Sequence, residues 1–430
     1  MQIQPVSSLR GTVHLPGDKS ISHRYAVLAA MAKGSTTIRN FSNSQDCQST
    51  LDCLQDIGVD IHRREREVEI QSQGWTEFQQ PTRTLDAGNS GTTIRFLSAL
   101  LCGSSFASTI QGDPSLNRRP MRRIIVPLTR MGASISAHQD EYPPLRISGA
   151  SLQGIHYRLP LASAQVKSCL LLAGLMARGQ TVVEETTPTR NHTELALPFF
   201  NASPKHENGR ITIEGPASLK PVQMEIPGDF SAAAFFILAA LLLPDSEIHL
   251  AGVGVNPSRT ALLALLEQAG VYLEKANMRL SNGEPVCDLT VRHSHQLLDR
   301  FPAQIQGEWI PNLIDEIPIL AVLGTCLERG LAVRQAEELR KKESDRIHST
   351  VLNLRNIGIQ VEEFPDGFAI PPGQQIRGGR VQSLGDHRIA MAFSVAGLIG
   401  VRPVEIDDPA CVSVSFPGFF EVLQSLAVNS

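Results

Sequence analysis

Residues 17–31 read GDKSISHRYAVLAAM, and this stretch contains the pattern from which the whole fold can be interpreted. Asp18, directly after Gly17, is a good helix N-cap, and the apolar run rich in Ala that follows predicts a buried helix. Lys19 and Arg24 stand in the first turns of that helix, where their charge opposes the helix dipole. A bound anion explains such cations better than helix stability does.

The same arrangement of a polar or acidic turn and an apolar helix occurs six times along the chain. The six turns contain, in chain order, Asp18, Asn89, Ser163, Asp229, Asp315 and Asp386. In four units a second helix is followed by a glycine and a β-like run, and these glycines are Gly58, Gly132, Gly270 and Gly358. We therefore predict an α/β protein of six units, three plus three, in which converging helix N-termini form an anion site.

The composition limits the class of protein. A chain of 430 residues is expected to form two domains, and a net charge of -4 without a clustered basic excess argues against nucleic-acid binding. The seven cysteines are scattered and never form a CxxC pair, which argues against metal or disulfide frameworks and favours a reducing compartment. The first ten residues lack an apolar core of signal-peptide length, so we expect no secretory signal. The longest apolar run, 230–243, is shorter than the roughly 20 residues of a membrane span. We predict a cytoplasmic monomer without metal, cofactor, membrane or nucleic-acid partner.

Two segments of the first half carry further anion-binding chemistry. Residues 86–95 read DAGNSGTTIR, in which Gly88 and Gly91 permit close backbone approach to an oxyanion, whereas the absence of a GK[ST] sequence argues against a nucleotide. Residues 118–123 read RRPMRR, and their spacing does not decide which arginine faces a site.

The third unit combines a hydroxyl and amide turn with a second helix start. Residues 162–168 read ASAQVKS and place Lys167 in the first turn of an apolar helix. Residues 189–194 read TRNHTE, in which His192 is equally compatible with a structural role and a site role.

The second half contributes mixed charges. Residues 339–346 read LRKKESDR; on one helix, Lys342 and Arg346 would share a face suited to a carboxylate, although a salt-bridged surface helix is the alternative. Asp315 and residues 385–388, GDHR, place acids at helix starts, where an acid beside anions and lysines can be tuned as a general base.

Together these segments resemble the enolpyruvylshikimate-phosphate synthase family, the 3-phosphoshikimate 1-carboxyvinyltransferases, over nearly the whole chain. The resemblance implies two similar domains, each of three βαβαββ units (an inverse α/β barrel), joined by a two-stranded hinge and closing over the substrates. It assigns residues 18–227 to an N-terminal domain on the shikimate-phosphate side, and residues 1–17 with 228–430 to the second domain.

The implied reaction joins phosphoenolpyruvate to the 5-hydroxyl of shikimate 3-phosphate through a tetrahedral intermediate and releases phosphate, a step toward chorismate and the aromatic amino acids. For shikimate 3-phosphate the resemblance implies Lys19, Ser20, Arg24, Ser163, Ala164, Gln165, Arg190, Asp315 and Lys342. For phosphoenolpyruvate it implies Lys19, Gly91, Arg119, Gln165, Lys342, Arg346 and Arg388. Asp315, Glu343 and Lys19 would transfer protons, with Glu343 and Lys19 as alternatives for each step at the methylene and the leaving phosphate. Whether Lys341 or Lys342 faces the cleft stays open.

Two rival interpretations are disfavoured. The sister transferase that acts on a UDP-linked amino sugar starts with GAKN and uses a loop cysteine, whereas this chain has Asp18-Lys19-Ser20 and no cysteine between Cys102 and Cys169. A non-catalytic anion-binding relative would be expected to lose Lys19, Asp315, Glu343 or Arg388, and all four are present.

Overall fold

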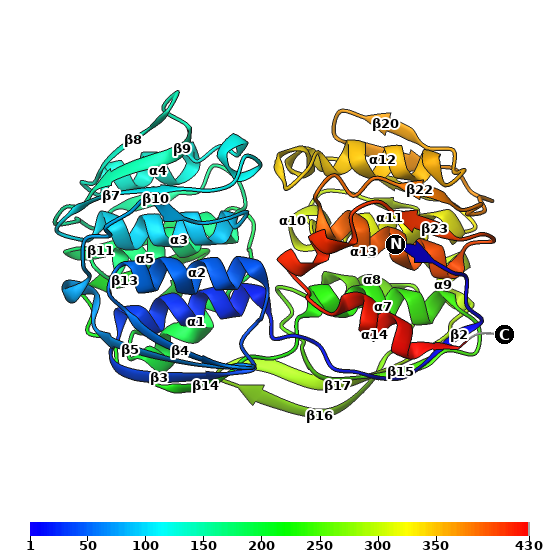
Figure 1. Ribbon diagram of the computed structural model, residues 1–430, viewed down its shortest axis with the longest axis horizontal. Coiled ribbons are helices and arrows are strands. Elements are labelled where there is room, and N and C mark those ends of the chain that lie inside the picture. Colours follow the sequence, from blue (N-terminus) through cyan, green and yellow to red (C-terminus); the bar gives the residue numbers. More distant parts are fainter. Residues whose placement is uncertain (429–430) are drawn as a thin grey trace. The chain divides into compact units, whose positions relative to one another are not determined.

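A computed structural model describes residues 1–428. Residue contacts divide the chain into two compact units, each treated separately below (Figure 1). One unit contains Met1–Pro16, Pro227–Leu280 and residues 285–428, and the other contains Gly17–Ile226 with the short segment Ser281–Glu284. Positions 429 and 430 of the predicted second domain lie outside the described residues.

Three sheets with one strand order make up the unit that starts at Gly17. Their orders are β14 (Gln223–Glu225), β3 (Lys33–Arg39), β5 (Glu67–Gln73), β4 (Asp60–Arg64); β6 (Leu85–Asp86), β7 (Ala107–Gln111), β9 (Tyr142–Ser148), β8 (Ser134–His138); and β10 (His156–Arg158), β11 (Gly179–Glu184), β13 (Arg210–Gly215), β12 (Lys205–Glu207). In each sheet the first pair is parallel and the other pairs are antiparallel.

Two helices accompany each of these sheets. The first helices are α1 (Lys19–Met31), α3 (Gly91–Cys102) and α5 (Ala164–Gly174). The second helices are α2 (Gln45–Asp56), α4 (Arg122–Arg130) and α6 (His192–Ala196). Because α3 connects β6 to β7 and α5 connects β10 to β11, each forms the crossover between parallel strands. The predicted α/β fold with repeated βαβαββ units is confirmed.

The other unit repeats this plan with altered edges. Its sheets are β16 (Glu274–Ser281), β17 (Glu284–Arg292), β15 (Glu247–Gly254), β2 (Ser8–Val13), β24 (Ala427–Val428); β18 (Gln304–Ile305), β19 (Leu331–Val333), β21 (Gly367–Ile370), β20 (Glu362–Phe364); and β1 (Gln2–Ile3), β23 (Val404–Ile406), β22 (Gly379–Val381). Its first helices are α7 (Phe230–Leu242), α11 (Ile317–Cys326) and α13 (His387–Ile399). Its other helices are α8 (Ala261–Gln268), α9 (Gln296–Arg300), α10 (Trp309–Leu313), α12 (Arg346–Asn356) and α14 (Phe419–Leu426).

One strand in each unit comes from a distant part of the sequence. β14 directly precedes α7 in the chain but pairs in parallel with β3, and β2 near the N-terminus pairs in parallel with β15. Consequently α1 and α7 each follow a strand that belongs to the other unit's sheet. The chain passes between the units near residues 16 and 227, and again on either side of Ser281–Glu284.

The first helices lie in the interiors of their units, because their bodies are apolar on all sides and most of their polar residues lie in the first two turns. In α7 only the last residue is not fully buried, and α1 and α13 are nearly as enclosed. A helix without a polar face has no surface suited to water. The sheets therefore cover the helices from outside, which Figure 1 shows within each unit, and each unit has its own hydrophobic core.

Helix ends follow the turn chemistry of the sequence. The four predicted glycines have positive φ, from +76° at Gly270 to +112° at Gly132. In the third unit Asn201 adopts the left-handed region at φ 66°, so it replaces the glycine found elsewhere.

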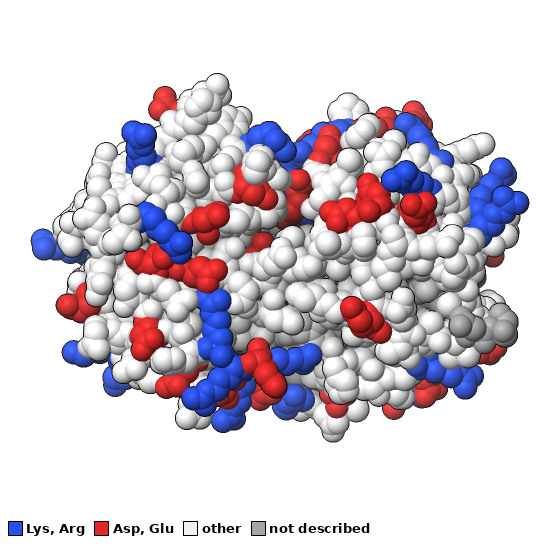
Figure 2. Space-filling view, viewed as in Figure 1, with Lys and Arg blue, Asp and Glu red and all other residues white. Residues whose placement is uncertain are grey.

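The surface carries charges of both signs. On the face shown in Figure 2, acidic and basic side chains are interspersed, in agreement with the net charge of -4. Within residues 1–428, no helix combines the length and apolarity needed to cross a bilayer.

Replacing Gly270 by Ala should lower the free energy of unfolding by about 1–2 kcal/mol, because its φ of +76° is strained for a residue with a Cβ. Gly270→Asn should lose less, since Asn tolerates this region better. Thermal unfolding of the three proteins measures the difference. Equal unfolding midpoints for the wild type and Gly270→Ala would contradict the conclusion that position 270 requires a positive φ.

Candidate functional site

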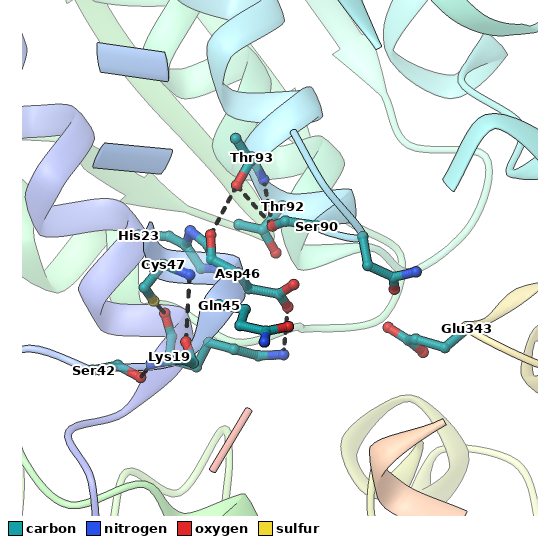
Figure 3. Close-up of polar contacts among 12 residues, drawn as sticks. Lys19, His23, Ser42, Gln45, Asp46, Cys47, Ser90, Thr92, Thr93 and Glu343 are labelled. Atoms are coloured by element: carbon teal, nitrogen blue, oxygen red, sulfur yellow. Dashed lines mark hydrogen bonds and ion pairs between the residues drawn. The ribbon is translucent and has the colours of Figure 1, made fainter. Parts of the chain in front are cut away.

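Lys19 is held at the start of α1 by the neighbouring helix α2. The Asp18 carboxylate caps α1 by accepting from the backbone N–H of Ile21 at 2.9 Å. Lys19 Nζ donates to Asp46 Oδ2 at 2.7 Å, and Asp46 lies in the first turn of α2 (Figure 3). The sequence predicted Lys19 but missed Asp46, because their pairing across two helices leaves no signal in either segment.

A chain of buried hydroxyl groups joins these helices to α3. His23 Nδ1 lies 2.7 Å from Thr50 Oγ1, which lies 2.6 Å from Thr93 Oγ1. Thr93 Oγ1 donates to Ser90 Oγ at 2.7 Å (Figure 3). Burial, together with the charges of Lys19 and Arg24, lowers the pKa of His23 well below its ordinary value. The N-termini of α1, α2 and α3 are therefore fixed relative to one another by contacts among neutral groups.

Ser90 rather than Asn89 caps α3, which refines the predicted turn. Ser90 Oγ accepts from the backbone N–H of Thr93 at 3.0 Å. The Asn89 side chain instead accepts from Arg119 Nη2 at 2.6 Å and donates to Asp113 Oδ2 at 2.7 Å. Asn89 is displaced from the cap because Arg119 and Asp113 engage its side chain.

The structure distinguishes the four arginines that the sequence could not separate. Arg119 is buried at the N-terminal end of α3, whereas Arg118 and Arg122 are exposed and Arg123 is half-buried. Among them, Arg119 therefore is the arginine brought to the predicted anion site.

Gly91 and Gln165 meet through Arg95, a residue that no pattern in the sequence singled out. Arg95 Nη1 donates to the Gly91 carbonyl at 2.8 Å and to Gln165 Oε1 at 2.9 Å. Gln165 Nε2 donates in turn to Thr92 Oγ1 at 2.8 Å. A Cβ on Gly91 would lie 2.6 Å from Arg95 Nη1, so glycine lets this guanidinium pack against the helix start.

Arg24 is buried where α1, α5 and α6 meet. It donates from Nε to Thr193 Oγ1 at 2.9 Å, from Nη1 to the Ser20 carbonyl at 2.7 Å and from Nη2 to Ser168 Oγ at 3.0 Å. Burial lowers the pKa of Arg24 to about 10, and nearby Arg190 adds to this shift while Glu194 opposes it. The predicted residues Ser20, Arg24 and Arg190 thus belong to one neighbourhood.

The start of α5 supplies the remaining predicted residues of this unit. Ser163 caps the helix by accepting from the backbone N–H of Val166 at 3.3 Å, and Ala164 is its first residue. Ser163, Ala164 and Gln165 therefore lie at the positive end of an eleven-residue helix.

Lys167 and His192 are internal groups paired with buried carboxylates rather than open ligands. Lys167 is 1% exposed and pairs with Glu185 at 2.9 Å and Glu194 at 2.7 Å. His192 Nδ1 lies 2.7 Å from Glu284 Oε1, and both side chains are buried. The structure therefore gives His192 a structural partner.

In the other unit, Arg346 is a fully buried hub for three carboxylates. Its Nε donates to Asp386 Oδ2 at 2.8 Å, its Nη2 donates to Glu343 Oε2 at 2.5 Å, and its Nη1 lies 3.4 Å from Asp315 Oδ1. Burial disfavours the charged form of Arg346, but Asp386, Glu343 and Asp315 outweigh it and raise its pKa. Predicted Arg346, Glu343 and Asp315 are brought together, whereas the central role of Asp386 was not predicted.

Arg388 holds the other side of Asp315. Its Nη1 donates to the Asp315 carbonyl at 3.1 Å, and its Nε lies 3.5 Å from Asp315 Oδ1. The residue before α11 is Glu316, and no side chain caps that helix. The Asp315 carboxylate, which the sequence placed among the helix caps, is thus engaged with two arginines instead.

The prediction that Lys342 and Arg346 share a helix face is wrong. Asp345 caps α12 by accepting from the backbone N–H of His348 at 3.0 Å, so the helix begins at Arg346. Lys342 is extended, with φ −92° and ψ −158°. Lys341 is exposed and Lys342 is half-buried, which distinguishes the two lysines.

Each unit therefore gathers helix N-termini with cations and carboxylates. Fold and site together define an α/β protein built from repeated βαβαββ units, with charged groups at its helix N-termini. Comparison with known proteins gives the family. The sequence model of the family EPSP synthase (3-phosphoshikimate 1-carboxyvinyltransferase) matches residues 3–423, and the chain belongs to this family.

Relatives support the assignment over the full length. The 3-phosphoshikimate 1-carboxyvinyltransferase of Solibacter usitatus is 46% identical and that of Salinibacter ruber is 47% identical, each over 99% of both chains. A solved EPSP synthase from Acinetobacter baumannii is 38% identical, with a TM-score of 0.86 over 100% of this chain and 98% of its own. The predicted enolpyruvyl transferase fold is confirmed.

Lys167→Met should destabilise the protein by about 3–5 kcal/mol, because it leaves Glu185 and Glu194 as buried charges without their cation. The matched control is Lys220→Met, which removes an exposed lysine and should change stability by less than about 0.5 kcal/mol. Thermal unfolding compares them. Similar midpoints for the two variants would show that the buried ion pairs contribute little.

Proposed function

We propose that this chain transfers the enolpyruvyl group of phosphoenolpyruvate to the 5-hydroxyl of shikimate 3-phosphate and releases phosphate, as its family membership indicates. The observation that carries the proposal is the environment of Asp315, whose carboxylate lies 3.4 Å from Arg346 and 3.5 Å from Arg388. Both substrates are multiply anionic, and the attacking hydroxyl must lose a proton. The two guanidinium groups suit the anionic substrates, and the carboxylate between them can accept the proton of the hydroxyl.

The shikimate 3-phosphate site is assigned chiefly to the starts of α1 and α5. The N-terminus of α5 offers backbone N–H groups and a positive dipole to a phosphate. Arg24 and Arg190 supply nearby positive charge. The proposed ligands are Lys19, Ser20, Arg24, Ser163, Ala164, Gln165, Arg190, Asp315 and Lys342.

The residues proposed to bind phosphoenolpyruvate include groups at the N-terminus of α3 in one unit and at the N-termini of α12 and α13 in the other. Arg119 reaches the start of α3, and Gly91 is the first residue of that helix. Arginine suits phosphate and carboxylate because its guanidinium binds them bidentately. The proposed ligands are Lys19, Gly91, Arg119, Gln165, Lys342, Arg346 and Arg388.

The proposed chemistry is addition followed by elimination. Asp315 takes the proton of the 5-hydroxyl while the hydroxyl oxygen attacks the central carbon of phosphoenolpyruvate, and the methylene carbon gains a proton to become a methyl group. The tetrahedral intermediate then loses a proton from this methyl group as the bond between carbon and the phosphate oxygen breaks, and phosphate leaves. Glu343 and Lys19 carry these protons, and the cations offset charge on phosphate and carboxylate.

Phosphate release from phosphoenolpyruvate in the presence of shikimate 3-phosphate tests the function. Asp315→Ala and Glu343→Gln should each lower kcat by about 100-fold or more, which is the usual contribution of general acid–base catalysis. A UDP-linked amino sugar offered as the acceptor is the control for the sister reaction. No release by the wild type, or unchanged release by both variants, would overturn the assignment.

The two adjacent lysines give a matched pair. Lys342→Met should reduce kcat/KM for phosphoenolpyruvate by about tenfold or more, because it removes a proposed charge-assisted contact. Lys341→Met removes an exposed side chain and should leave kcat/KM within about twofold. Equal losses would contradict the assignment, and the reverse order would move the role to Lys341.

The proposal includes the predicted organisation of the chain. Residues 18–227 form the domain on the shikimate-phosphate side, and residues 1–17 with 228–430 form the second domain; the two contact-defined units support this division. A monomeric state and a cytoplasmic location stay predictions from the sequence.

A further inference from the structure

The proposed mechanism does not use three buried polar residues beside Asp315 and Arg388. Arg259, Glu316 and Ser231 are 3%, 1% and 5% exposed, and they come from the loop before α8, the residue before α11 and the first turn of α7. All three lie in one unit of the fold.

Arg259 and Glu316 form a two-pronged ion pair. Arg259 Nη1 donates to Glu316 Oε2 at 3.1 Å, and its Nη2 lies 3.0 Å from Glu316 Oε1. Burial opposes the charge on Arg259, but Glu316 and Asp315 outweigh it and raise its pKa. Because the desolvation of two charges offsets much of their attraction, such a pair contributes little to stability. A role in fixing geometry is the better explanation.

Ser231 links this ion pair to Arg388. Its hydroxyl donates to Glu316 Oε1 at 2.6 Å and accepts from both Arg259 Nη2 and Arg388 Nη1, the latter at 2.8 Å. A serine hydroxyl has one donor and two acceptor positions, so this set of bonds saturates it. Its proton cannot turn away from Glu316 without losing a bond, and the lone pair that faces Arg388 is therefore fixed in direction.

The same trio also reaches Asp315 through the chain. Glu316 follows Asp315 directly, and the Asp315 carbonyl accepts from the Arg388 nitrogen that Ser231 also contacts. Ser231 is itself held by Asp229, whose carboxylate accepts from the Ser231 backbone N–H at 2.7 Å. Both partners of the Arg388–Asp315 pair are thus anchored to one buried network.

We propose that Arg259, Glu316 and Ser231 are positioning residues that hold the Arg388 guanidinium in its binding orientation for the carboxylate or phosphate of phosphoenolpyruvate. The inference rests on the proposed function. A guanidinium fixed before binding loses less rotational freedom when the anion arrives, so the trio acts on affinity for the donor and not on affinity for the acceptor.

Steady-state kinetics of Ser231→Ala tests this. The KM for phosphoenolpyruvate should rise about tenfold or more, since the variant removes the hydrogen bond from Arg388 together with those with Glu316 and Arg259, while the KM for shikimate 3-phosphate should stay within about twofold. The matched control is Ser394→Ala, which removes a buried hydroxyl from α13 whose only described partner is the Ala390 carbonyl. Ser231→Cys keeps a side chain of similar size but makes weaker hydrogen bonds, so its KM for phosphoenolpyruvate should lie between those of the wild type and Ser231→Ala. It serves as the second variant if the alanine protein does not fold.

A double-mutant cycle with Arg388→Lys separates positioning from general damage. If Ser231 acts through Arg388, then Ser231→Ala should reduce kcat/KM for phosphoenolpyruvate much less in the Arg388→Lys background than in the wild type. An unchanged KM for phosphoenolpyruvate in both Ser231 variants, or a full additive loss in the cycle, would overturn the inference. Because wild-type turnover is measured first, these outcomes leave the proposed function standing.

Discussion

The parallel pairing of the first two strands in each repeat is the constraint on which the rest of the structure depends. A parallel pair of consecutive strands requires a crossover, here the apolar helices α3, α5, α11 and α13, whereas exchanged strands complete the parallel pairs beside α1 and α7. This repeated arrangement orients the first helices of a unit alike. Their N-termini therefore meet at one place in each unit. In one unit, hydrogen bonds of Asp46 with Lys19 and of Thr92 with Gln165 join neighbouring helix starts. In the other unit, the hydrogen bond of Ser231 with Glu316 does the same.

Converging N-termini concentrate positive potential, and the chain balances it with its own acids. Asp46 pairs with Lys19, while Asp386, Glu343 and Asp315 surround Arg346. A buried arginine without such partners would be too costly to maintain as a charge. The carboxylates thus have two functions: they keep the cations ionised and fixed, and in the proposed mechanism Asp315 and Glu343 also move protons.

The arrangement separates stability from chemistry within each repeat. The bodies of α1, α7 and α13 are buried on all sides and form the cores, whereas the polar residues that cap and flank their first turns remain at the site. Buried hydroxyl groups such as Thr50, Thr93 and Ser231 connect neighbouring helix starts. Such hydrogen-bonded networks fix orientation because rotating a buried hydroxyl would break the bonds that it makes.

The sequence by itself determined the six repeats, the α/β class, most helix starts and the cluster of charged residues at them, because capping and apolar periodicity are local properties. Tertiary structure alone decided which arginine of residues 118–123 is buried at α3, that Asp315 pairs with arginines instead of capping α11, and that Lys342 lies outside α12. It also decided the partners Asp46, Arg95 and Asp386, and the exchange of β2 and β14. These features depend on which residues that are distant in the chain become neighbours in space. A local sequence pattern does not determine such contacts.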